Sequence, residues 1–226
     1  MNEQKCGLNG FAIKMIAVAA MLTDHIGAIL YPELTVLRII GRIAFPIFCF
    51  LLAEGFLHTR NVKRYLLRMF LFALISEIPF DLAFSGKWFD PESQNVYWTL
   101  FLGLLMLYLM QKAEKRFPVS MKMICDLLIL LVFCIAAEYL EVDYHLGGML
   151  IIFIFYYFRG GKGKWIGYVL CALVLIFFYG GIEPWAVIGF VPMLLYNGRR
   201  GPSAKWVFYL FYPCHILVLY FIGLVI

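Results

Sequence analysis

The sequence predicts an all-α, polytopic integral membrane protein: one helix bundle with about nine transmembrane helices. Hydrophobic residues make up 64% of the 226 residues and charged residues 15%, against soluble averages of about 45–50% and 25%. The apolar residues form blocks near the length that crosses a ~30 Å hydrocarbon core as a helix, with charged breaks between them. No segment between blocks is long enough to be a soluble appendage, so residues 1–226 are expected to form a single transmembrane domain.

The expected spans follow from the apolar blocks in chain order. They are Gly10–Tyr31, Val36–Leu57, Val62–Phe84, Val96–Gln111, Met121–Leu140, Leu146–Phe158, Trp165–Tyr179, Pro184–Tyr196 and Trp206–Leu224. The sixth and eighth are short, which favours little tilt or a thinned or re-entrant region.

Ala17-Val18-Ala19 imitates a signal-peptidase site. The apolar run before it is short and interrupted by Lys14, so the N-terminus is expected to be retained.

Basic residues predict the orientation, because sixteen of the nineteen fall on alternate connections. These are Lys5, Lys14, Arg60, Lys63, Arg64, Arg68, Lys112, Lys115, Arg116, Lys122, Arg159, Lys162, Lys164, Arg199, Arg200 and Lys205. The positive-inside tendency then places the N-terminus in the cytoplasm and the C-terminus outside. The formal charge of +5 is therefore topological, and no nucleic-acid partner is expected.

The second block carries a charge inside an apolar run. Arg42 there costs about 2.5–3.5 kcal/mol in hydrocarbon, which asks for a partner or a role. Pro46 has no N–H and would free the carbonyl of Arg42, so the span is expected to bend at its charge.

Other polar residues fall at a similar depth in the outer half, which predicts a wet, outward-facing cavity. They are Asp24, His25, Ser76, Glu77, Asn95, Thr99, His145 and His215. The alternative is an ion-pair network, such as Arg42 with Asp24 or Glu77, that only joins helices.

His25 is the best proton acceptor in this set, since imidazole is neutral near pH 7. Asp24 can fix its tautomer. Adjacent helical residues diverge by about 100°, however, so Asp24 can instead pair with Arg42 and leave His25 free, or His25 can simply be hydrogen-bonded to a neighbouring helix.

Near the C-terminus, Pro213 would free the carbonyl of Tyr209 and bend the helix beside His215. That bend can direct His215 into the cavity or serve packing alone. Cys214 is a poor nucleophile in such apolar surroundings.

On the inner side, Glu54 and His58 lie one turn apart and are followed by Arg60, Arg64 and Arg68. Such a cluster of basic residues would suit the phosphates of an acyl-CoA donor, although the positive-inside tendency alone also explains why basic residues occur there. The alternative donor site is Arg199 and Arg200.

The cysteines show no CxxC spacing and predict neither disulfide nor metal. The sequence also lacks HExxH, GxSxG and a phosphate-loop glycine pattern.

Three blocks together resemble the TraX family of bacterial membrane proteins: "MLTDHIG", then "GRIAFPIFCFLLAEGFLHTRN" with "YLLRMFLFALISEIPFDL", and finally "YPCHILVLY". The resemblance is dense over Phe11–Thr99 and thin over Pro118–Gly198. That family is named for a conjugal-transfer protein that N-acetylates pilin and is grouped with the membrane acyltransferases.

The resemblance implies acetyl transfer from cytoplasmic acetyl-CoA to an extracytoplasmic peptide or glycan, by a multi-pass protein of the bacterial cytoplasmic membrane. It points to His25 as general base, with Asp24, Arg42, Glu77 and His215 as further catalytic candidates. The donor candidates are His58, Arg60, Arg64 and Arg68.

Two other functions use the same residues. A small transporter or permease would use the polar cluster as a substrate or proton site, but the odd span count and the lack of a repeat disfavour it. A purely structural membrane protein would leave the cluster unexplained.

Overall fold

The computed structural model describes residues 7–161 and 163–226, and most of them are helical. The helices are α1 (Gly10–Ile29), α2 (Thr35–Gly41), α3 (Ala44–His58), α4 (Val62–Phe84), α5 (Val96–Arg116), α6 (Val119–Tyr139), α7 (His145–Tyr157), α8 (Gly163–Phe178), the 3₁₀ helix η1 (Glu183–Gly189), α9 (Phe190–Leu194) and α10 (Lys205–Gly223). The described part of the chain holds two isolated β-bridges and no strand. The prediction of an all-α membrane bundle is confirmed. Lys5, Cys6 and Lys162 lie outside the described residues.

Three helices begin at an asparagine whose side chain replaces a missing backbone partner. Asn9 accepts from Ala12 N at the start of α1, and Asn95 accepts from Tyr97 N at the start of α5. Asn61 caps α4 in the same way. Because the first N–H groups of a helix have no partner within it, these caps fix where each of the three helices starts.

Five helical segments are long and apolar enough to cross a membrane: Gly10–Ile29, Thr35–His58, Val96–Arg116, Val119–Tyr139 and Lys205–Gly223. α7 has 13 residues and extends only about 20 Å. The eighth expected span is not one helix, which corrects that prediction. It is η1 followed by the five-residue α9. Pro184 and Pro192 lack the N–H that a continuous helix needs.

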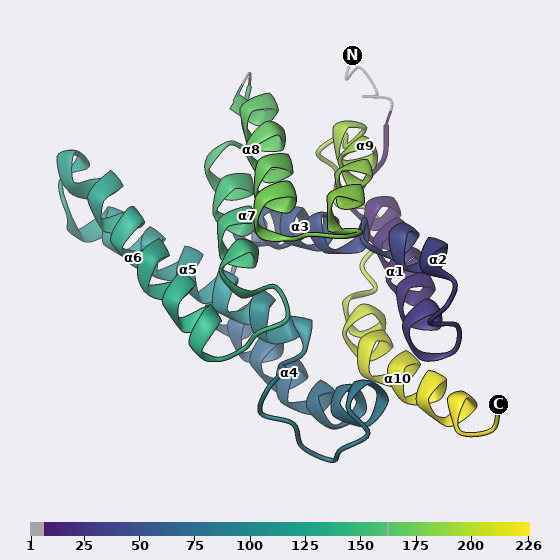
Figure 1. Cartoon of the computed structure of the whole chain (residues 1–226). Helices are drawn as coiled ribbons and strands as arrows, with labels where there is room; N and C mark the ends of the chain where they lie inside the picture. The colour runs from purple at the N-terminus through teal and green to yellow at the C-terminus, as the bar shows by residue number, and fades with distance from the viewer. Residues whose placement is uncertain (1–6, 162) are drawn as a thin grey trace.

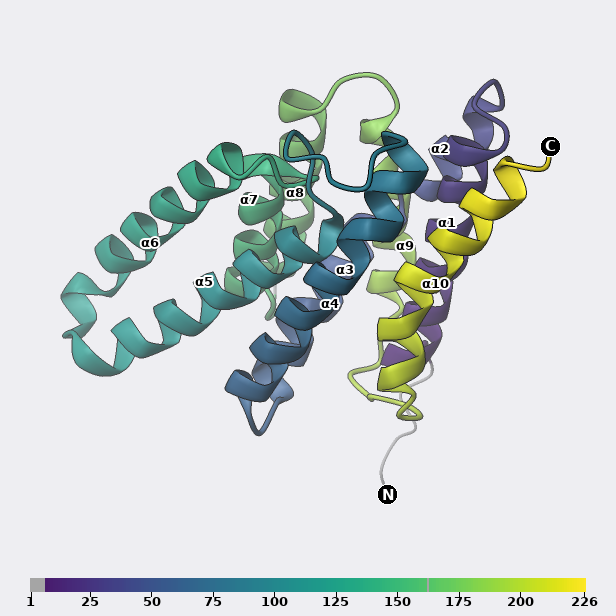
Figure 2. The ribbon, with the colours of Figure 1, turned by 90° about the horizontal axis from the view of Figure 1, so that it is seen from below.

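The ends of the chain lie on opposite sides of the bundle. Figure 1 shows the N-terminal end and the α7–α8 turn at one side, with the C-terminus, the α1–α2 turn and the α4–α5 loop at the other. In Figure 2 the α3–α4 turn also lies on the N-terminal side. The helices therefore alternate in direction, and the basic connections share one side.

Helix packing leaves apolar faces for lipid. α1 packs against α2, α3 and α10, while α6 packs mainly against α5 and α7. The outer face of α6 exposes Ile124, Leu128 and Val132. In water such a face would be costly, but in a bilayer it meets hydrocarbon.

Two prolines act as their positions predict. The second expected span is interrupted between α2 and α3 at Arg42 and Ile43, and Figure 1 shows the two helices running in different directions. In α10, Pro213 cannot donate to the carbonyl of Tyr209, and the Tyr97 hydroxyl donates to that carbonyl at 3.2 Å.

Candidate functional site

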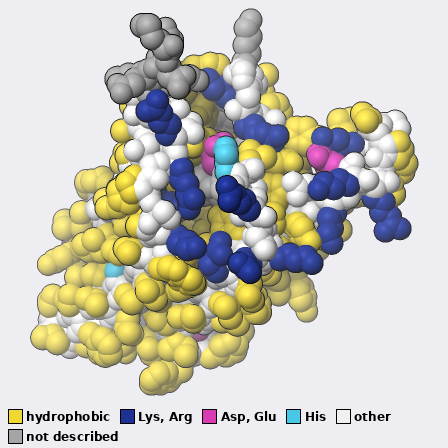
Figure 3. All heavy atoms as spheres, turned by 180° about the vertical axis from the view of Figure 1, so that it is seen from behind, with side chains coloured by type: hydrophobic (Ala, Val, Ile, Leu, Met, Phe, Trp, Pro, Cys, Tyr) yellow, Lys and Arg dark blue, Asp and Glu magenta, His cyan; other side chains and the backbone are white. Residues whose placement is uncertain are grey.

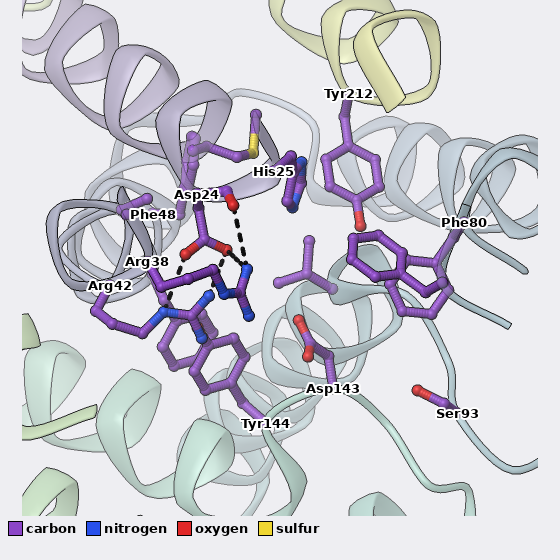
Figure 4. A pocket seen from close by; sticks show the side chains of 16 residues that line it. Asp24, His25, Arg38, Arg42, Phe48, Phe80, Ser93, Asp143, Tyr144 and Tyr212 are labelled. Carbon is purple, nitrogen blue, oxygen red and sulfur yellow. Dashed lines mark hydrogen bonds and ion pairs between the residues drawn. The ribbon is translucent and has the colours of Figure 1, made fainter. Parts of the chain in front are cut away.

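A cavity of ≈ 220 Å³ opens at the side of the bundle opposite the N-terminus. It lies between the end of α1, the α2–α3 break, the end of α4, the loop before α7, and α10. Figure 4 shows a charged side made by Asp24, Arg38 and Arg42 and an aromatic side that includes Phe80 and Tyr212.

An ion-pair network forms the charged side. Arg42 donates through Nε and Nη2 to the two carboxylate oxygens of Asp24, and through Nη1 to Glu183 Oε1 at 2.6 Å. Arg38 Nη1 lies 2.6 Å from Asp24 Oδ2. Gly41 permits this approach, because a Cβ there would overlap the Asp24 side chain. The network ties α1 to the α2–α3 break and to η1.

His25 is hydrogen-bonded to His215 rather than to Asp24. The His25 Nδ1 to His215 Nε2 distance is 2.7 Å, and the His215 Nδ1 to Phe211 O distance is also 2.7 Å. A carbonyl only accepts, so His215 carries its proton on Nδ1 and accepts at Nε2. His25 must then donate from Nδ1, which leaves the lone pair of its Nε2 free. The two rings are nearly parallel, at 8°.

The loop before α7 supplies the opposite wall. The Tyr179 hydroxyl donates to Tyr144 O at 2.5 Å, and the Tyr144 ring lies parallel to that of Phe45. Asp143 lines the cavity and is exposed to solvent there. Partial loss of hydration within the cavity, with Glu183 and Asp24 nearby, raises the pKa of Asp143 to about 7 against the opposing effect of Arg42.

Of the eight expected outer polar residues, Asp24 and His25 line the cavity, whereas Ser76, Glu77, Asn95, Thr99, His145 and His215 do not. Glu77 accepts from Trp98 Nε1 at 2.7 Å and from the side chain of Asn95, so it joins α4 to the start of α5. Thr99 accepts from Tyr144 N at 3.4 Å. His145 lies 3.7 Å from Glu138 Oε2. The structure therefore brings together Asp24, His25, Arg42 and His215 from the predicted catalytic set and leaves Glu77 out.

Three residues that sequence reasoning did not select complete the cluster. Arg38 precedes Arg42 by four positions and shares its helix face, a signal that spacing could have shown. Asp143 lies in the α6–α7 loop and Glu183 begins η1, in connections where the sequence predicts acidic residues. Nothing in the sequence around these two residues predicts that they lie near the cavity.

The predicted donor residues lie on the other side. Figure 3 shows Lys and Arg side chains gathered toward the N-terminal side of one face, above a mainly hydrophobic lower part. Arg60 and Arg64 are exposed, and His58 Nδ1 donates to Glu54 O at 2.8 Å. Arg68 lies over the rings of Tyr65 and Tyr209, at 5.7 and 5.9 Å.

The described residues contain no group of three or more His, Cys, Asp or Glu side chains placed to hold a metal ion. The five cysteines in that part of the chain are free, and Cys214 is exposed beside the buried His215.

The family model described as "TraX protein" matches residues 9–223, which include every helix and the whole cavity. The chain belongs to the TraX family. It is 30% identical over 238 residues to a "probable fimbrial assembly protein FimC, serogroup H1" of Dichelobacter nodosus, covering 93% of this chain and 94% of that protein. An uncharacterized protein of Rickettsia prowazekii is 34% identical over 105 residues, 46% of this chain and 39% of its own length. No solved structure matches.

Proposed function

We propose that this TraX-family protein is a membrane acyltransferase that moves an acetyl group from cytoplasmic acetyl-CoA to an acceptor on the extracytoplasmic side of the bacterial cytoplasmic membrane. The observation that carries the proposal is the free Nε2 of His25 in the cavity, with its tautomer set by His215. A neutral imidazole with a defined lone pair is suited to remove a proton near pH 7.

The reaction balances with these groups. The acceptor N–H or O–H gives its proton to His25 Nε2 while its nitrogen or oxygen attacks the thioester carbonyl carbon. The C–S bond then breaks, and the departing thiolate takes the proton from the His25 imidazolium. The products are acetylated acceptor and free CoA, and His25 is neutral again.

Each side of the protein contributes to substrate choice. The basic residues on the inner face, Arg60, Arg64 and Arg68 with His58, are suited to the phosphates of CoA. The acceptor is a peptide amine or a glycan. The name of the Dichelobacter nodosus relative, a fimbrial assembly protein, favours a peptide acceptor from a surface fibre.

The test is acetyl transfer by purified protein. Wild type incubated with radiolabelled acetyl-CoA should release labelled acetate, because water can take the place of the acceptor, whereas a transporter built on the same cavity would leave the thioester intact. His25→Gln should lower the rate about 10²–10⁴-fold without changing donor affinity. His145→Gln is the matched control, because that histidine lies outside the cavity. A folded His25→Gln protein with wild-type turnover would refute the proposal.

The proposed orientation has its own test. Asn61 and Ser93 are exposed on opposite sides of the bundle. In intact cells an impermeant thiol reagent should label Ser93→Cys and leave Asn61→Cys unmodified, with the parent protein as background control. Labelling of Asn61→Cys alone would invert the topology and place the cavity on the cytoplasmic side.

A further inference from the structure

Arg38 and Arg42 hold the same carboxylate, but Arg42 uses more of its nitrogens to do so. Its three nitrogens all donate to Asp24 or Glu183. Its side chain is 11% exposed. Arg42 therefore holds the network together and has little capacity left for a substrate.

Arg38 makes its contacts with one nitrogen. Nη1 donates to Asp24 O at 3.2 Å and to Asp24 Oδ2 at 2.6 Å. A guanidinium has five N–H groups, and within the described part of the chain the Nε and Nη2 groups of Arg38 have no hydrogen-bond partner. The side chain is 28% exposed. Figure 4 shows its guanidinium facing the cavity between His25 and Asp143.

We infer that Arg38 is the anion-binding catalytic residue of this cavity, donating from Nε and Nη2 to the negative oxygen that forms when the acceptor attacks the thioester carbonyl. The inference rests on the proposed function and adds a residue to it. Asp24 holds the guanidinium in place before the reaction, so little reorganisation is needed as charge develops. Donors fixed in this way stabilise a transition state more than freely moving ones.

The net charge around Arg38 allows such an anion to bind there. Two guanidinium groups face two carboxylates, Asp24 and Glu183, so the network is formally neutral. Asp143 is a further carboxyl in the cavity lining, and among the described residues it forms no hydrogen bond or ion pair with Arg38. The oxyanion would then be the group that uses the free donors.

The kinetic test compares variants of one position. Arg38→Gln should lower kcat for acetyl transfer about 10²–10³-fold, with KM for acetyl-CoA little changed, because the contact forms only in the transition state. Arg38→Lys should recover part of the loss, since it keeps the charge without the fork of donors. Added guanidinium ion should partly restore Arg38→Gly. Arg116→Gln, on the exposed end of α5, is the control and should match wild type.

A binding test separates this inference from the proposed function. Methylphosphonate, a tetrahedral anion with a methyl group, should raise the melting temperature of wild type but not of Arg38→Gln. If methylphosphonate binds through Arg38 while wild type transfers no acetyl group, the anion site stands and the acyltransferase proposal fails. If wild type transfers acetyl and folded Arg38→Gln keeps its kcat, the assignment of Arg38 is wrong. Arg38→Lys replaces Arg38→Gln in both tests if the latter does not fold.

Discussion

The cavity and the basic face at the opposite end of the bundle use charge in opposite ways. That face is called the inner face here, because the proposed orientation places it on the cytoplasmic side. Around the cavity, Asp24, Arg38, Arg42 and Glu183 form one connected set of ion pairs between segments far apart in the sequence. On the inner face, Arg60, Lys63 and Arg64 are exposed and have no carboxylate partner among the described residues. Charges enclosed by protein need partners to be tolerated, whereas hydrated charges do not.

The difference indicates where chemistry and where binding belong. In the cavity Asp24 holds Arg38 and Arg42 by ion pairs and His215 holds His25 by a hydrogen bond, so His25 Nε2 and the remaining donors of Arg38 have defined directions. On the inner face the side chains are free to move and can follow a flexible, multiply charged ligand. Precise proton transfer needs the first arrangement, and loose capture of a phosphate-rich donor can use the second.

The largest expected effect comes from breaking the enclosed network. Arg42→Gln would leave Asp24 and Glu183 without their shared partner, and removing one member of a buried pair costs about 3–5 kcal/mol. Denaturation in detergent should show this loss of stability. Arg64→Gln, the exposed counterpart, should change stability by less than about 0.5 kcal/mol. Equal stability of the two variants would remove the distinction between the two regions.

Much of this contrast could be read from the sequence, because proline chemistry and depth are local properties. Pro46 predicted the break at Arg42, and Pro213 predicted the freed carbonyl of Tyr209. The pairing of Asp24 with Arg42 was one of two open alternatives.

The positions of Glu77 and Asp143 could not be predicted from the sequence, because they depend on helix rotation and loop placement. Glu77 has the expected depth, but α4 is rotated so that Glu77 contacts Trp98 and Asn95 instead of the cavity. Asp143 reaches the cavity only because the α6–α7 loop folds over it. No periodicity in the sequence encodes either fact.

The next largest effect concerns the hydrogen bond between His25 Nδ1 and His215, which leaves the lone pair of His25 Nε2 free. His215→Phe keeps the ring shape but removes the acceptor for His25 Nδ1–H, so both tautomers become accessible. Acetyl transfer should fall at least about tenfold, by less than in His25→Gln. His215→Gln offers a carbonyl acceptor and should retain more activity than His215→Phe. A pure packing role would instead lower the melting temperature in both variants and spare turnover.

Smaller effects are expected on the inner face, where exposed charges contribute up to about 1 kcal/mol each. Arg64→Ala or Arg68→Ala should weaken acyl-CoA binding up to about fivefold, measured by titration calorimetry. The loss should be larger at low salt than at high salt, because screening shortens the range of these charges. Unchanged binding in both variants at low salt would assign these arginines to topology and move the donor site toward Arg199 and Arg200.

The last effect depends on pH and should come from Asp143, which lines the cavity yet is exposed to solvent. Its pKa in the folded protein is about 7, above the ordinary 3.8, because partial loss of hydration and the carboxylates of Glu183 and Asp24 oppose ionisation more than Arg42 and Arg38 favour it. Between these two values the folded state holds the proton more tightly than the unfolded state.

The contribution of Asp143 to stability is therefore fully present below pH 3.8 and decreases as the pH rises through about 7. Asp143→Asn cannot ionise, so its stability should lack this decrease, and the difference from wild type should grow from pH 5 to pH 8. Melting temperatures across that range test the prediction, with Asp90→Asn in the outer loop as a control carboxyl. Parallel curves for wild type and Asp143→Asn would mean that Asp143 is hydrated like an ordinary surface group. The cavity would then be as wet as the inner face, and the contrast between the two regions would rest on the ion pairs alone.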